Sequence, residues 1–129
     1  MGLPVIALFG GAERGLLETA YYCDSLHTLF ELLGEPPEDS QGRFFAVQTI
    51  LYGNPLVYFR VREEGVSLSD YLLGLEMLSA PDFPIKDIRA LFLPGVGSKS
   101  VVDEGLKVCR LRRSFFIVNE NDFYDLLTD

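Results

Sequence analysis

The residues of this chain best suited to bind a ligand lie in a glycine-rich loop at positions 94–100, between an apolar segment and a short predicted helix. Gly95 and Gly97 fill two positions of the G-x-G-x-x-G dinucleotide fingerprint, and Ser100 stands where the third glycine belongs. Such a loop brings backbone amides and the positive end of a helix dipole close to phosphate. Glu120 ends the next apolar segment, where a dinucleotide site has its ribose-binding carboxylate.

The same loop does not have the Walker A spacing, because Ser98 precedes Lys99 where that motif has a glycine. A more general anion site is one interpretation, with Ser98, Lys99, Ser100 and backbone amides as its donors. The other interpretation is a strand-to-helix connector, in which the glycines permit the turn and the serines cap the helix.

A second glycine-containing segment, at positions 10–15, also follows a predicted strand and contains Arg14. Ligands in open α/β sheets bind outside the carboxyl ends of the strands. If the predicted strands at 4–9 and 88–93 are parallel neighbours, both loops lie at the same sheet edge. The charged and polar residues expected to converge there are Glu13, Arg14, Ser98, Lys99, Asn119 and Glu120.

No catalytic residue can be assigned from the sequence, and the cofactor is unknown. His27 is the only histidine, Asp24 is its only nearby carboxylate, and there is no G-x-S-x-G nucleophile motif. Cys23 and Cys109 are predicted to be core thiols, since two cysteines do not form a disulfide framework. We expect no metal site, because the chain has one histidine and no C-x-x-C motif.

The alternation of apolar runs and turn residues predicts a single α/β domain over residues 1–129, with helices packed on a mixed sheet of about five strands. Gly53 and Asn54 indicate a β-hairpin between the second and third strands. The predicted order is β-α-β-β-α-β-α-β-α. The predicted strands are residues 4–9, 44–52, 56–62, 88–93 and 114–118. The predicted helices are residues 13–33, residues 67–79, one that begins after Ser100 and a short one that begins near residues 119–121.

Charge and hydropathy narrow the classes of partner. The chain has 129 residues, is 48% hydrophobic and has a formal net charge of −8, so it can form a core but repels nucleic acid. The basic cluster Lys107, Arg110, Arg112 and Arg113 is expected to follow a helix carboxyl end. The sequence offers no signal peptide and no run long enough to span a membrane, so we expect a soluble cytoplasmic protein.

Aromatic residues supply a candidate interface. If one face of the sheet is uncovered, Phe44, Tyr52 and Tyr58 are expected to form an exposed patch that binds another protein or a second copy of the chain.

Three functions therefore remain open. The first is a small acidic interaction or regulatory module without catalysis, with self-association as one form of it. The second is a nucleotide- or phosphate-binding domain that uses residues 95–100. The third is a small enzyme whose reaction the sequence does not name.

Overall fold

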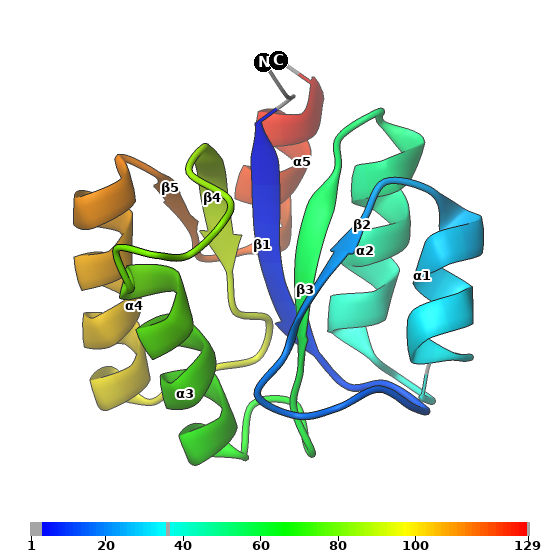
Figure 1. The fold of residues 1–129 in the computed structure, drawn as a ribbon, viewed down its shortest axis with the longest axis horizontal. Coiled ribbons are helices and arrows are strands. Elements are labelled where there is room, and N and C mark those ends of the chain that lie inside the picture. The colour runs from blue at the N-terminus through cyan, green and yellow to red at the C-terminus, as the bar shows by residue number, and fades with distance from the viewer. Residues whose placement is uncertain (1–3, 36, 129) are drawn as a thin grey trace.

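A five-stranded mixed sheet organises the protein in the computed structural model, which describes residues 4–35 and 37–128. The strand order is β2-β3-β1-β4-β5 (Figure 1). Four strands are parallel, and β2 runs antiparallel to β3 at one edge. The strands are β1 (Val5–Gly10), β2 (Ala20–Cys23), β3 (Leu56–Arg60), β4 (Ile88–Phe92) and β5 (Phe115–Ile117).

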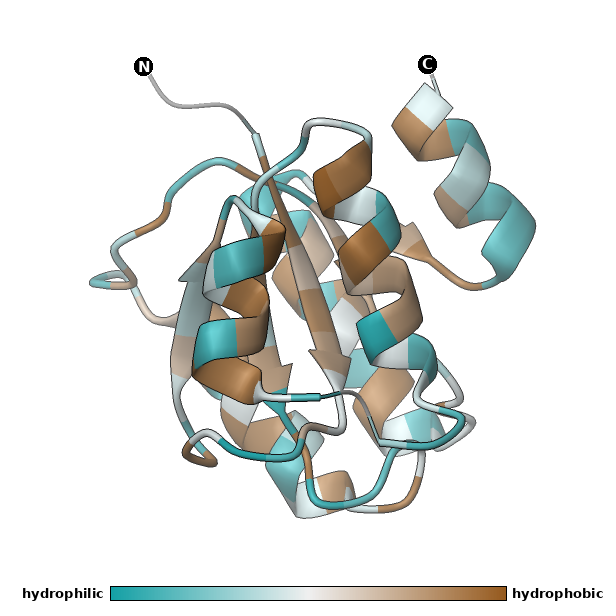
Figure 2. Ribbon diagram, turned by 90° about the vertical axis from the view of Figure 1, so that its right-hand side faces the viewer, coloured by the Kyte–Doolittle hydropathy of each residue, from teal (hydrophilic) through white to brown (hydrophobic). Residues whose placement is uncertain are grey.

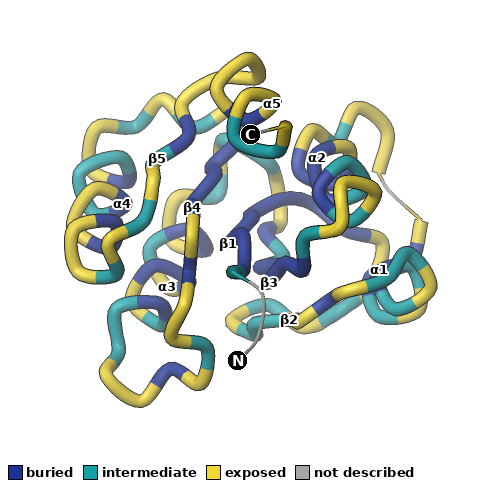
Figure 3. Tube along the Cα trace, turned by 90° about the horizontal axis from the view of Figure 1, so that it is seen from above, coloured by how far each residue is buried: buried dark blue, intermediate teal, exposed yellow. Residues whose placement is uncertain are grey.

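Helices cover both faces of the sheet, so the core has two halves (Figures 1 and 3). One face packs against α1 (Leu26–Leu33), α2 (Gln41–Leu51) and α5 (Glu120–Thr128). The other face packs against α3 (Leu68–Ser79) and α4 (Lys99–Arg112). Strand β1 is buried along its whole length, as its continuous apolar sequence predicts for a central parallel strand. Figure 2 shows mostly hydrophobic strands between helices that carry both hydrophobic and hydrophilic residues.

The predicted fold class is confirmed: this is an α/β domain with a mixed five-stranded sheet and helices packed on it. Two local assignments are wrong. Residues 44–52, predicted to be a strand, belong almost entirely to α2, which begins where Ser40 Oγ accepts a hydrogen bond from Arg43 N at 3.2 Å. The predicted hairpin is therefore absent, and β3 instead pairs with β2, a strand inside the segment predicted to be one long helix.

The connections create a topological switch point between β1 and β4. The chain leaves β1 and returns to β3 over the α2 face, then crosses from β3 to β4 over the α3 face. The loops after β1 and β4 consequently diverge at the carboxyl edge of the sheet, where ligands of open α/β sheets bind. The condition set from the sequence is met, because β1 and β4 are parallel neighbours with Ala7 opposite Leu91. No helix in the described part of the chain is long and apolar enough to cross a membrane.

Candidate functional site

The loops that follow β1, β3 and β4 meet at the carboxyl edge of the sheet. Glu64 and Gly65, in the loop after β3, contact the other two. Glu64 lies in the connection from β3 to α3, and its Oε2 accepts a hydrogen bond from Gly11 N, after β1, at 2.8 Å. The neighbouring Gly65 lies against the loop after β4, where an added Cβ atom would be 2.7 Å from the Gly95 carbonyl oxygen. Residues 64 and 65 therefore lie against the loops after both β1 and β4.

The Glu64 carboxylate also caps the amino end of α2. Its Oε1 accepts hydrogen bonds from Gln41 N at 2.9 Å and Gly42 N at 3.3 Å, and Ser40 Oγ donates to Oε2. These amides are among the first of the helix, which have no partner within it, and the helix dipole favours a negative charge there. Together with Gly11 N they form a set of donors of the kind that binds anions, and Glu64 is its occupant.

Tyr58 lies directly beneath this arrangement and is fully buried. Its hydroxyl donates to the Gly11 carbonyl oxygen at 2.8 Å. Burial, and then the nearby Glu64 carboxylate, raise the pKa of Tyr58 well above its ordinary value, so the hydroxyl remains a donor. Since Tyr58 is in the core, the predicted exposed patch that included it is wrong at this residue. The error follows from the second predicted strand, whose true helical state covers this face.

A cleft of about 970 Å³ opens beside these loops. It lies between the first turns of α2, the loop after β4 and the β5–α5 junction. Its lining includes the aromatic residues Phe44, Phe45, Phe92 and Phe116 together with several polar residues. Those polar side chains are Asp39, Ser40, Gln41, Gln48, Asn119 and Glu120.

The charged residues that line the cleft are Asp39, Arg43 and Glu120. Asp39 and Glu120 are exposed. The guanidinium of Arg43 is buried, donates to the Gly34 carbonyl oxygen at 2.7 Å and stacks on the Phe30 ring. Burial lowers the pKa of Arg43 from its ordinary value. Because Arg43 is committed to the end of α1, the exposed charge of the cleft is negative.

Comparison with known proteins identifies no relative: no family model matches the chain, and no curated protein or solved structure is significantly similar to it.

Of the ligand-binding residues predicted in the glycine loop, Gly95 lines the cleft, whereas those at positions 97–100 do not. Gly95 lines the cleft and has φ of +77°, so the left-handed turn alone accounts for a glycine there. Gly97 has no atom within 4 Å of an added Cβ, so neither packing nor turn geometry requires it. Lys99 Nζ bonds Asp103 Oδ2 at 2.7 Å, and the hydroxyls of Ser98 and Ser100 bond each other at 3.0 Å. These three side chains thus have partners outside the cleft.

The structure brings together only some of the residues expected to converge. Glu120 and Asn119 lie in the cleft with Gly95, and Asn119 Oδ1 caps α5 by accepting from Asp122 N at 2.9 Å. Arg14 lies elsewhere: its guanidinium donates to the Phe30 and Glu31 carbonyl oxygens, each at 3.0 Å.

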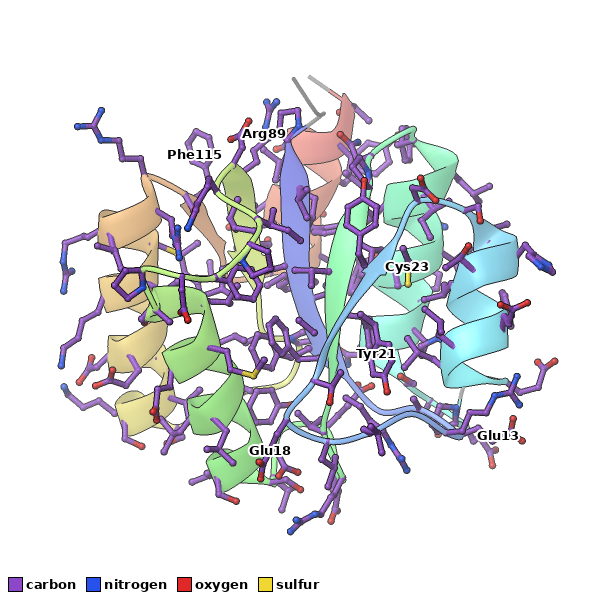
Figure 4. The ribbon with its side chains drawn as sticks, in the orientation of Figure 1. Glu13, Glu18, Tyr21, Cys23, Arg89 and Phe115 are labelled. Carbon is purple, nitrogen blue, oxygen red and sulfur yellow. The ribbon has the colours of Figure 1, made fainter. Side chains whose placement is uncertain are left out.

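Glu13, near the lower end of α1 in Figure 4, accepts from Glu35 N at 3.0 Å. The pair formed by Glu13 and Arg14 therefore secures the carboxyl end of α1 rather than the cleft.

The remaining reactive side chains are also outside the cleft. His27 is exposed on α1, with Nε2 3.2 Å from Glu31 Oε2. Cys23 and Cys109 are buried, and burial raises the pKa of each thiol to about 11, so neither is a good nucleophile at neutral pH. Among residues 4–35 and 37–128, no group of three or more His, Cys, Asp or Glu residues is arranged to hold a metal ion.

Two predicted interface residues are exposed but do not form one patch. Phe44 is 52% exposed and lies in the cleft. Tyr52 is at the other end of α2, where its ring packs edge-on against Tyr124 at 6.2 Å. Sequence reasoning missed Glu64 and the amino end of α2. Ser40 gave the only local signal, since it is a good N-cap residue after an acidic, proline-containing segment.

Proposed function

We propose that the protein is a small binding module whose cleft holds a flat, partly apolar molecule with a neutral or cationic polar group. The observation that carries this proposal is the cleft of about 970 Å³ with aromatic walls. Its size and its mixture of apolar walls with a few polar groups are typical of small-molecule sites. It also lies at the carboxyl edge, beside the switch point, where open α/β sheets bind ligands.

The electrostatics of the cleft favour this ligand class over a phosphate. Asp39 and Glu120 line it, and the whole chain has a net charge of −8. Aromatic faces attract cations, so the rings of the lining act in the same direction as the two carboxylates. Lys99, the cation expected to hold a phosphate, is paired with Asp103 instead.

A matched set of probes tests the proposal, because benzamidine, benzamide and benzoate carry a cationic, a neutral and an anionic group on the same ring. We expect the affinity to decrease in that order, with the largest amide chemical-shift changes at Gln48, Gly95 and Asn119 in an NMR titration. Each of these residues lines the cleft.

The matched variants for this titration are Phe44→Ala, which removes an exposed ring from the cleft, and Leu51→Ala, which removes an exposed apolar side chain of the same helix outside it. Loss of an aromatic contact should weaken benzamidine binding about threefold to tenfold in the first variant only. Tightest binding by benzoate would favour the phosphate-ligand alternative, and shifts confined to residues outside the cleft would refute the proposal.

A further inference from the structure

Strand β5 is an edge strand with an apolar border. It pairs only with β4, so its outer backbone groups have no strand beside them in the sheet. Phe115 in this strand, Val118 directly after it and Leu111 near the end of α4 are 64%, 66% and 61% exposed. Phe115 projects from the start of β5, and the strand forms an outer margin of the sheet (Figures 3 and 4).

The charges at the two ends of β5 have opposite signs. Arg110 and Arg113 precede the strand and are exposed, whereas Glu120 and Asp122 follow it and are also exposed. Antiparallel pairing of two identical strands places the beginning of each beside the end of the other. With Phe116 at the centre, Phe115 of one copy lies opposite Ile117 of the other. The α4–β5 turn that contains Arg113 then faces the β5–α5 junction that contains Glu120.

We infer that β5 is the contact surface for a second copy of this chain, joined by antiparallel β5–β5 pairing into one continuous sheet. A twofold axis through such a pair makes the contact self-complementary. It brings Leu111 on α4 towards its symmetry mate on one face of the sheet and Phe115 towards its own on the other. Apolar burial and opposite charges then act at the same interface.

The overall charge of the molecule supports this location. Two molecules with a net charge of −8 repel each other, so an interface between copies needs local compensation. Four of the 11 lysine and arginine residues lie between positions 107 and 113, immediately before β5. Lys107 is paired with Glu104, and Arg112 donates to the Leu78 and Ala80 carbonyl oxygens. Arg110 and Arg113 are therefore the cations assigned to the interface. Strand β2, the opposite sheet edge, has the acidic residues Glu18 and Asp24 on either side and no such basic cluster.

Sedimentation of the full chain tests the inference, in a concentration series from about 1 μM to 1 mM that covers weak to moderate affinities. We expect a monomer–dimer equilibrium for the natural sequence. Phe115→Lys should raise the dimer dissociation constant at least about tenfold, since it places a charge in the apolar border. Tyr22→Lys is the matched control, because Tyr22 is an exposed aromatic residue on the opposite edge strand; this variant should leave the dissociation constant unchanged.

A charge exchange tests the antiparallel register and does not depend on Phe115. Arg113→Glu should weaken the dimer, and adding Glu120→Arg to the same chain should restore it, with folding checked by circular dichroism. A monomer throughout the concentration series would overturn the inference. So would a dimer that responds to Tyr22→Lys but to neither Phe115→Lys nor Arg113→Glu.

Discussion

The Glu64 carboxylate lies at the amino end of α2, where a bound anion would otherwise accept hydrogen bonds from the free backbone amides. It accepts hydrogen bonds from Gly11 N and Gln41 N at 2.8 and 2.9 Å, and its charge is complementary to the dipole of α2. This one side chain therefore ties the β3–α3 loop to both β1 and α2. The same contacts hold Glu64 outside the cleft, whose lining does not include it.

Replacing Glu64 with Gln should lower the free energy of unfolding by about 1.5–3 kcal/mol, the range for hydrogen bonds to a charged group. The glutamine amide keeps one acceptor oxygen but directs an NH₂ group at other donors. Urea denaturation measures the change. Glu63→Gln is the matched control, because Glu63 is the exposed neighbouring residue of the same type and should shift the value by less than about 0.5 kcal/mol. Equal losses in both variants would contradict the role assigned to Glu64.

At the scale of elements, the close approach of α2 to β1 depends on two glycines. A Cβ atom added to Gly42 would lie 2.6 Å from Gly10 Cα and 2.7 Å from the Phe9 carbonyl oxygen. Both neighbours are backbone atoms of a buried central strand, so neither can move without displacing the sheet. The helix is thereby positioned close enough to share the Glu64 carboxylate with Gly11.

Gly42→Ala should therefore destabilise the protein by about 1–3 kcal/mol or more, the cost of overpacking, despite the better helix propensity of alanine. Gly97→Ala is the control for glycine removal as such, since nothing lies within 4 Å of its added Cβ. It should be neutral or slightly stabilising in the same thermal denaturation experiment. A Gly42→Ala protein as stable as the natural one would show that α2 can withdraw from β1.

Elements with a regular pattern could be predicted from the sequence, whereas α2 and β2 could not. The segment from β4 to α5 was assigned correctly, because apolar runs alternate there with glycines and polar residues. Residues 44–52 resemble a strand because apolar and aromatic side chains occur around the whole helix. Phe45 packs in the core, while Phe44, on an adjacent side, lines the cleft, so no single apolar face marks the helix. Strand β2 is only four residues long and leaves no clear alternation.

At the scale of the whole molecule, the site depends on contacts that no local pattern encodes. Glu64 and Gly11 are separated by 53 positions in the sequence, and only the strand order brings them together. The candidate site could be predicted to the level of the sheet edge and of Gly95, Asn119 and Glu120. Arg14 and Lys99 were included because of their charge, but the structure gives each of them a nearer partner.

Burial is uneven across the molecule, and this predicts where it opens first. Strand β1 is buried throughout, whereas β5 and α5 contribute Ile117 and Phe123 as their buried residues. Phe123 holds α5 in place by packing on Phe45 and Phe92, with ring centroids 4.8 and 5.0 Å apart. Segments with few buried contacts open locally at a smaller free-energy cost than the core. The cleft lies between α2, which packs on the buried central strands, and the less stable β5–α5 segment, called the margin below.

A ligand that bridges the two regions should therefore protect the margin more than the centre. In hydrogen–deuterium exchange, residues 115–128 should exchange faster than β1 and β3 in the free protein. Saturating benzamidine should slow exchange in residues 115–128 severalfold, because a ligand bound only to the closed state lowers the population of the open state. The β2–α1 segment, which lies outside the cleft lining, is the internal control. Protection spread equally over both segments would mean that the ligand stabilises the fold as a whole and does not hold the β5–α5 margin against α2.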